Sequence, residues 1–400
     1  MSSTIQAFRY ALEASFLIDS ENATILTGSI QNLVCKYDYE SKHMPIIYLS
    51  LRIADRLYDS MVRNIDKGSI SLTLYKFIQN ESIMVQKEIY FRSLFSYFIP
   101  QQMTFDDETK PKNDVLQADK DRAYKTCTIG LFDMTLVNNN ARYINLLFRN
   151  SDMLSIVHYC TSHMNMVIEP FKDHEKLDFC FTPPNLTINK LLQYLNSVHS
   201  FYNTGFRYFN EFKRSYLLST SGNPVNVSDE NYDTVILRIM DSQEYATKIM
   251  SMEIDRTQRA YIMYIDMEYV DLRIDHLKDK QYQKIIGVDT MGETIERDLN
   301  IPTHEENTEK IWYDRIMNGN MSYINTIKDN IESSSVILNI VKGEIDSSII
   351  SPNKEYLIKN PDNYKEYNGR YILAYKRELF VRQSDTFALN TVFGLRRIMD

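Results

Sequence analysis

The stretch "YNGRYILAYKRELFV", residues 367–381, decides the fold that the sequence predicts. Asn368 and Gly369 are typical of a turn, and the residues after them form an apolar run with the alternation of a β-strand. The preceding stretch "SPNKEYLIKN", residues 351–360, likewise combines a turn with a short strand. Neither stretch contains a residue set that is typical of catalysis. Together they predict a structural β-module.

Strand patterns surround this pair, and they define a C-terminal β-module at residues 311–400. Upstream, residues 221–310 predict a β-hairpin about "DRTQ", residues 255–258, and a polar, variable region at 276–310. The segments expected as strands of the C-terminal module are "SSVILNIV", "IDSSII", "EYLI", "YILAYKREL" and "TVFGLRRI".

Residues 1–104 predict a first β-domain that contains one short helix. Every second residue from Ile47 to Ile53 is apolar, which is typical of a strand with one buried face. Asp55 is expected to cap a helix that runs to Asn64. Its expected apolar side consists of Leu57, Tyr58, Met61 and Val62. Further strands are expected at 24–39, 46–53, 69–77 and 83–98.

Residues 105–123 are charged and nearly free of aromatic side chains, so we expect an exposed linker or loop there. Residues 124–220 then predict a second β-domain with helices. Strands are expected at 124–137 and 141–149, and Ser151 or Asp152 is expected to cap a helix that ends near Met164.

The strongest helical pattern of the sequence covers residues 187–199, with Thr187 as the expected N-cap. A turn at Asn203–Gly205 then leads into an aromatic strand. The order strand, strand, helix, strand occurs in both 24–98 and 124–180, which suggests a duplicated fold. We therefore predict an α+β fold that is predominantly β.

Composition narrows the class of protein. A chain of 400 residues predicts two or three domains, and 44% hydrophobic with 24% charged residues is typical of a globular protein. The net charge of −8 argues against specific binding of nucleic acid, which needs clustered cations. The sequence has no resemblance to a signal peptide, and no apolar run approaches the ~20 residues that span a membrane. The four cysteines form no CxxC pair, which predicts a reduced, intracellular folding compartment.

Motifs that carry chemistry are not found. The sequence has no P-loop, GxGxxG, HExxH or GxSxG motif. One cluster contains His158, Cys160, His163, His174 and Cys180. The two histidines at its start are five residues apart, which suits neither one helix face nor the compact pairs of structural zinc sites. We expect no metal site, no cofactor and no catalytic residue.

Charged residues have ordinary interpretations. Among the 53 acidic residues, Glu211 and Asp233 are candidates for the carboxylate pair of a glycosidase, but we expect them to be solvated. The basic residues near the C-terminal end predict a solvated β-surface, with a contact for an acidic partner as the alternative. These basic residues are Lys376, Arg377, Arg382, Arg396 and Arg397.

Three segments resemble one protein family. The segment "SIQNLVCKYDYESKHMPIIYLSLRIADRLYDSMVRNIDKGSISLTLYKF", residues 29–77, resembles the N-terminal region of bacteriophage tail hub proteins. The segment "PPNLTINKLLQYLNSVHSFYNTGFRYFNEFKRSYLL", residues 183–218, is similar to the middle signature of these proteins, and 345–391 is similar to their closing module. Together the segments cover about a third of the chain, in the expected order.

The resemblance implies a structural virion protein that is not an enzyme, at the centre of the baseplate. Hub proteins of this kind form trimeric rings, and each chain contributes two similar tube-like β-domains. The ring adapts the sixfold tail tube to the threefold spike and leaves a channel for DNA. Its implied partners are further copies, a central spike or spike-linked lysin, tube and baseplate proteins, and the tape-measure protein. Assembly in the host cytoplasm and localisation in the virion are implied too.

The ring gives the strands a physical role. We expect strands of neighbouring domains to pair or abut, so that closure removes free sheet edges. Two alternatives stay open. One is a tail-associated peptidoglycan hydrolase, which would need paired acids in a cleft. The other is a different virion component, such as a portal or a receptor-binding protein.

Overall fold

The structure is a computed structural model, and it describes most of the chain in segments. The described residues are 7–18, 22–40, 43–80, 83–98, 124–171, 176–199, 201–202, 206–211, 214–219, 234–240, 252–255, 257, 259–272, 284–288, 293–298, 311–314, 336–342, 349–360 and 363–398.

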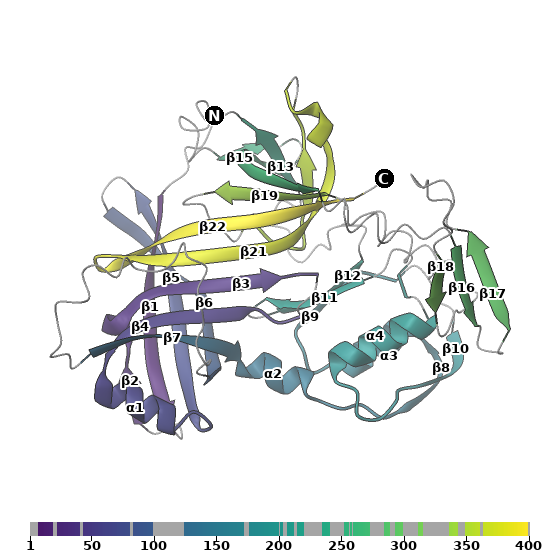
Figure 1. Ribbon diagram of the computed structural model, residues 1–400, viewed down its shortest axis with the longest axis horizontal. Coiled ribbons are helices and arrows are strands. Elements are labelled where there is room, and N and C mark those ends of the chain that lie inside the picture. The colour runs from purple at the N-terminus through teal and green to yellow at the C-terminus, as the bar shows by residue number, and fades with distance from the viewer. Residues whose placement is uncertain are drawn as a thin grey trace.

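Strands from the N-terminal third and from the C-terminal end of the chain form an eight-stranded antiparallel barrel (Figure 1). Hydrogen bonding runs in the order β21–β3–β4–β7–β6–β5–β1–β22, and the pairing of β22 with β21 closes the circle. The barrel closes within one chain, so the expected pairing between copies is not needed to complete its wall. The strands are β1 (Ala7–Ile18), β3 (Ile30–Asp38), β4 (Ile46–Ala54), β5 (Gly68–Asn80), β6 (Ile83–Phe98), β7 (Tyr124–Asp133), β21 (Gly369–Gln383) and β22 (Thr386–Arg397).

The hairpin of β21 and β22 is longer than the barrel wall. The far halves of its two strands belong to a second closed ring of hydrogen-bonded strands, here called the second circuit. There the order is β22–β19–β15–β13–β20–β21, so the hairpin closes this circuit as well. Short edge strands β2 (Asn22–Ile25) and β14 (Met252–Asp255) pair with β1 and β15. The other strands of the second circuit are β13 (Thr234–Ile239), β15 (Ala260–Leu272), β19 (Val336–Lys342) and β20 (Glu355–Ile358).

A β-bulge between Leu373 and Tyr375 marks the passage of β21 from one circuit to the other. A bulge adds one residue to a strand, so it exchanges the faces on which later side chains lie. Tyr371 and Leu373 are buried before the bulge, whereas Lys376, Glu378 and Phe380 are buried after it. The bulge therefore points two charged residues inward.

The barrel core consists of alternate residues along each strand, as period two requires. On β4 the buried side chains are those expected, from Ile47 to Ile53. Helix α1 (Asp55–Arg63) follows as predicted, but Ala54 is its N-cap and Asp55 lies in its first turn. Met61 is its buried residue, whereas Val62 is exposed, contrary to the expectation.

A second hydrophobic core lies between helices and small sheets in the middle of the chain. Helix α4 (Ile188–His199) confirms the predicted helix, and it buries Ile188, Leu191, Leu192 and Leu195 on one face. It packs with α3 (Met153–Thr161) against the two-stranded sheet of β8 (Leu147–Asp152) and β10 (Lys176–Phe181). A short helix, α2 (Met134–Asn140), leads from the barrel to this unit (Figure 1).

A three-stranded sheet connects the two cores. It contains β11 (Phe206–Glu211), β12 (Arg214–Ser219) and β9 (Met166–Ile168). Alternation along β11 and β12 places Phe209 and Tyr216 in the barrel-side core, and Tyr208 and Leu217 in the helical core. The same alternation puts Arg207 and Glu211 on the barrel side, on the face of Phe209.

Several local expectations are corrected. Residues 134–137 are helical and not a strand, because the Asp133 carboxylate accepts hydrogen bonds from the N–H groups of Thr135 and Leu136. The next strand begins at Leu147 and not at 141. Asp152 caps α3 through Ser155 N–H, as predicted, but the helix ends at Thr161.

A three-stranded sheet combines two strands of the variable region, which its polar sequence does not predict, with one strand of the expected C-terminal module. Strands β17 (Thr294–Asp298), β16 (Lys284–Val288) and β18 (Ile311–Asp314) form it in that order. Ile349 and Ile350 are expected in a strand, but they lie outside any strand. The expected hairpin about residues 255–258 is confirmed by the antiparallel pairing of β14 with β15. Single-turn helices occur at η1 (Thr27–Ser29) and η6 (Lys365–Tyr367).

The expected linker at 105–123 lies outside the described residues. The domain boundaries and the duplication stay predictions, although strands of the C-terminal module pair directly with the N-terminal strands β1 and β3. Within the described part of the chain, no helix has the length and apolar character needed to cross a membrane.

Gly394 lies opposite Tyr375 at the bulge. This pair tests the packing of the β21–β22 hairpin, which is shared by the barrel and the second circuit. A Cβ atom at Gly394 would lie 2.0 Å from Cε1 of the Tyr375 ring. We expect Gly394→Ala to lower the free energy of unfolding by about 1–3 kcal/mol through overpacking, measured by chemical denaturation.

Gly28→Ala is the matched control, because a Cβ atom there meets nothing within 4 Å. Its free energy of unfolding should stay within about 0.5 kcal/mol of the wild type. Equal stability of the two variants would contradict the close contact at the bulge.

Candidate functional site

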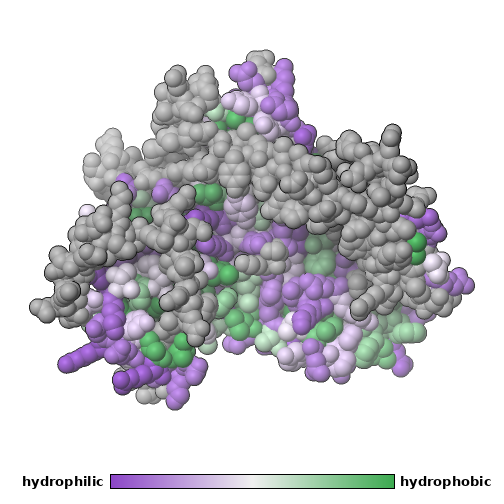
Figure 2. All heavy atoms as spheres, in the orientation of Figure 1, coloured by the Kyte–Doolittle hydropathy of each residue, from purple (hydrophilic) through white to green (hydrophobic). Residues whose placement is uncertain are grey.

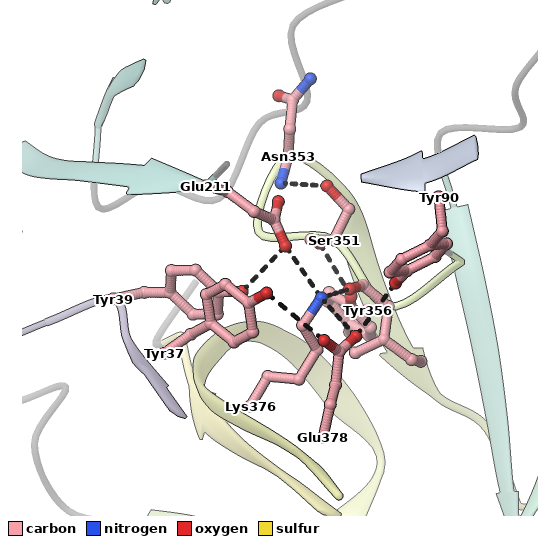
Figure 3. A network of polar contacts seen from close by, with 10 residues as sticks. Tyr37, Tyr39, Tyr90, Glu211, Ser351, Asn353, Tyr356, Lys376 and Glu378 are labelled. Carbon is pink, nitrogen blue, oxygen red and sulfur yellow. Dashed lines mark hydrogen bonds and ion pairs between the residues drawn. The ribbon is translucent and has the colours of Figure 1, made fainter. Parts of the chain in front are cut away.

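Two charged residues of β21, Lys376 and Glu378, form the centre of a buried polar network (Figure 3). Their side chains are 3% and 0% exposed, and they lie on the same face of the strand. The Lys376 ammonium lies 3.4 Å from a carboxylate oxygen of Glu378. It also donates hydrogen bonds to Glu211 Oε1 at 2.8 Å and to the carbonyl oxygen of Ile350 at 3.0 Å.

Tyrosine hydroxyl groups complete the network. Tyr37 and Tyr90 donate to the two oxygens of Glu378 at 3.3 and 3.1 Å, and Tyr39 donates to Glu211 at 3.2 Å. The Lys376 nitrogen lies 4.7 Å from the centre of the Tyr37 ring, within the range of a cation–π interaction. Each carboxylate thus has the ammonium and at least one phenol as partners.

The network joins parts of the fold that are far apart in the sequence. Tyr37 and Tyr90 belong to barrel strands, Glu211 ends β11, and Ile350 precedes β20. In that last segment the Tyr356 hydroxyl donates to the carbonyl oxygen of Ser351 at 2.8 Å. The contacts therefore hold the connecting sheet and the segment before β20 against the barrel (Figure 3).

Electrostatics favour a charged Lys376 and neutral Tyr37 and Tyr39 hydroxyl groups. Burial lowers the pKa of Lys376, but the carboxylates of Glu211 and Glu378 outweigh burial and raise it above its ordinary value. Burial raises the pKa of Tyr37 and Tyr39, and the carboxylates of Glu378 and Glu211 raise these pKa values further. A nucleophilic lysine needs a lowered pKa, so the arrangement supports a structural role.

The network corrects two expectations. Glu211, expected to be solvated, has a side chain that is only 17% exposed. Asp233 lies outside the described residues, so the proposed acid pair is not brought together in the structure. The two carboxylates that do lie near each other, Glu211 and Glu378, share one ammonium group and not an open cleft.

Two of the five basic residues near the C-terminal end are buried, and the other three are half-buried. Arg396 is buried and forms an ion pair with Glu40 at 2.5 Å, and Lys376 belongs to the network. Arg397 donates to the carbonyl oxygen of Asn368, and Arg382 donates to that of Gly28. A solvated basic surface is therefore the wrong interpretation for Lys376 and Arg396, while Arg377 is half-buried.

A buried arginine adds to this junction, and its sequence context gave no sign of burial. Arg207 on β11 donates to the carbonyl oxygen of Leu373 at 3.2 Å. Burial, together with the charge of Arg396, lowers the pKa of Arg207 to about 10, although Glu40 and Glu169 oppose the shift. Its backbone contact reaches the bulge of β21, so it ties the connecting sheet to the shared hairpin.

The histidine and cysteine residues of the sequence cluster are dispersed. Cys160 and Cys180 lie in the helical core, where burial raises the pKa of Cys160 to about 12. His163 contacts the Asn139 carbonyl at 3.3 Å, His158 is exposed, and His174 lies outside the described residues. Among the residues that the structure describes, no three His, Cys, Asp or Glu side chains could hold a metal ion.

One cysteine has a histidine neighbour that the sequence did not reveal. Cys180 Sγ lies 3.7 Å from His199 Nε2, because β10 packs beside the end of α4. Burial raises the pKa of Cys180 and lowers that of His199. Both shifts favour the neutral thiol and the neutral imidazole, so the pair lacks the thiolate of an activated nucleophile.

Two cavities lie away from the network. One of about 610 Å³ lies between the barrel, α2 and the connecting sheet, and its acidic lining residue is Asp133, which caps α2. The other, of about 420 Å³, lies between α1 and β7 and is lined by Lys125 and Cys127 among others. Among the described residues that line them, neither cavity has the paired acids of a glycosidase.

Removal of the central cation tests the network. We expect Lys376→Met to lower the free energy of unfolding by about 3–5 kcal/mol, because two buried carboxylates lose their counter-charge. Lys125→Met is the control, since Lys125 is half exposed and its ion pairs with Asp55 and Asp59 measure 3.7 and 3.9 Å. Its loss should cost at most about 1 kcal/mol in chemical denaturation.

The pH dependence of stability tests the same network independently. Lys376, Tyr37 and Tyr39 have raised pKa values, so above about pH 10 the unfolded chain loses protons that the folded protein retains. The contribution of these three groups to stability should therefore be constant below that pH and fall as the pH rises further. Lys376→Met should show a shallower fall in chemical denaturation, and an identical slope would contradict the assignment.

Comparison with known proteins gives the family and the fold. The family of the bacteriophage PBS1 gene 109 protein matches residues 1–398. No match was found among curated proteins. A tail protein from Neisseria meningitidis MC58 has a similar structure, with a TM-score of 0.53, 9% identity and coverage of 97% of both chains.

A second structure agrees with the first. The 43 kDa tail protein of prophage MuSo2 from Shewanella oneidensis has a TM-score of 0.51 and 9% identity, and again 97% of each chain is covered. The resemblance to phage tail proteins that the sequence segments indicated is thereby confirmed. The chain belongs to the family of the bacteriophage PBS1 gene 109 protein.

Proposed function

We propose that this protein is a structural component of a phage tail and forms the central hub of the baseplate. The observation that carries the proposal is the fold shared with two phage tail proteins over 97% of each chain. The phage family supports it, and so do the three segments that resemble hub proteins. Its place of action would be the virion, after assembly in the host cytoplasm.

The hub would be a trimeric ring that connects the sixfold tube to the threefold spike. Because the barrel closes within one chain, each copy would enter the ring as a finished unit. Contacts between copies would then be made by outer faces, and symmetric closure would limit the assembly to a fixed number of copies. The channel for DNA would lie between copies, because side chains fill the interior of the barrel.

A structural role fits the chemistry of the described residues. Glu211 and Glu378 neutralise a buried lysine, and Asp133 caps a helix, so these acids have structural partners. The alternative of a peptidoglycan hydrolase would need an acid pair across a sugar-sized cleft. Zymography with the purified protein tests it, and clearing of peptidoglycan that Glu211→Gln abolishes would support the enzyme.

Partners follow from the position of a hub. A central spike or spike-linked lysin would bind on one side, and tube, baseplate and tape-measure proteins would bind on the other. The chain carries a net charge of −8, which suits a channel wall that does not retain DNA.

The mass of the purified protein in solution tests the proposal. We expect a species of three times the mass of one chain, alone or with the spike protein added, because a ring needs three copies to close. Sedimentation equilibrium and native mass spectrometry measure it. A monomer under every condition, including the presence of the spike protein, would contradict the hub.

A further inference from the structure

We infer that the outer face of the sheet formed by β8 and β10 binds a second copy of this chain. The inference rests on the proposed hub, since it names the surface through which copies meet in the ring. It is carried by the exposure of large apolar side chains on this face, by the charges around them and by the place of the sheet in the molecule.

The pairing of β8 with β10 sets which side chains share the outer face. Phe181 lies opposite Leu147, and Phe179 lies opposite Arg149, so all four point to the same side. Phe179 is 72% exposed, and Leu147 and Phe181 are 51% and 50% exposed. The opposite face carries Phe148 and Cys180, which pack on the helical core.

The apolar area exposed on this face is that of a functional surface patch. With roughly 200 Å² for each aromatic side chain, the three apolar residues expose on the order of 300–400 Å². Patches of that size on monomers are often functional, and an interface of about 800 Å² per partner would contain this one as its apolar centre. Exposed Tyr143 and Leu146 extend it along the chain before β8.

Charge complementarity favours a second copy as the occupant. Arg149 is an exposed cation on the face itself. Arg142 and Lys176 are further exposed cations of these strands and the segment before them, and Asp178 is the exposed acid of the two strands. The chain as a whole carries −8, so another copy is acidic overall and opposite in sign to these exposed cations. An apolar centre with a charged rim is the usual composition of a protein interface.

The position of the sheet suits contact around a ring. In Figure 1 the β8–β10 sheet lies near one end of the longest axis, and the barrel with α1 and β2 lies near the other. Figure 2 shows hydrophobic residues gathered at the lower right, where Figure 1 places β8 and β10. Each of these two strands pairs only with the other among the described strands.

A single charge on the patch tests the inference. Phe179→Asp changes an exposed side chain, so the fold should persist, which circular dichroism and thermal unfolding verify. We expect the protein concentration at which half of the trimer is dissociated to rise about tenfold or more relative to the wild type. Sedimentation equilibrium over a concentration series measures the shift. Arg149→Glu should weaken association too, and added salt should weaken wild-type association.

Tyr364→Asp is the control, because Tyr364 is an exposed aromatic residue far from the sheet, between β20 and β21. Its backbone has a φ of 61°, a conformation that aspartate tolerates. This variant should associate like the wild type. Equal weakening by the control and by Phe179→Asp would overturn the assignment, because the effect would not be local.

The outcomes separate this inference from the proposed function. A wild-type trimer that Phe179→Asp leaves intact would overturn the inference and leave the hub standing. If that variant also failed to enter tails, the face would belong to a different tail protein. A wild-type protein that stays monomeric with and without the spike protein would refute both.

Discussion

Backbone hydrogen bonds along the hairpin of β21 and β22 are the constraint on which the rest of the structure depends. One half of the hairpin completes the eight-stranded barrel, and the other half completes the circuit of β13, β15, β19 and β20. Strands with a free edge expose unpaired N–H and C=O groups, so both circuits would open if this hairpin were displaced. The bulge at Leu373–Tyr375 lets one strand serve both, because it changes which side chains point inward.

The buried charges lie where this hairpin meets the connecting sheet. An apolar core of the same volume would often be as stable, so a lysine with two glutamates contributes specificity more than stability. Lys376, Arg207 and Arg396 each bond to a partner on another part of the chain. An altered position of β11 would leave buried charges unpaired, which is costly. The network thereby selects one arrangement of the two cores.

Much of the local structure could be predicted from the sequence, because period two on β4 and the apolar stripe of α4 follow directly from side-chain spacing. Closure of the barrel could not, since pairing of β21 with β3 joins residues more than 300 positions apart. The burial of Lys376 and Glu378 was missed because a single inserted residue exchanges the faces of β21. Strict alternation from Tyr371 would instead have placed Tyr375 and Arg377 inside. The sheet of β16–β18 has too little apolar periodicity to be recognised.

The separation of the barrel strands along the chain also governs when the protein can fold. The contact between Tyr37 and Glu378 spans 341 positions. The ribosome must therefore synthesise all of the intervening chain before the barrel wall can be completed. Contacts of such long sequence separation slow folding. Until then β1 lacks its neighbour β22 and β3 lacks its neighbour β21. The free edges of these strands can then pair between nascent chains on the same messenger RNA. A chaperone that holds the early strands apart would raise the yield of native protein.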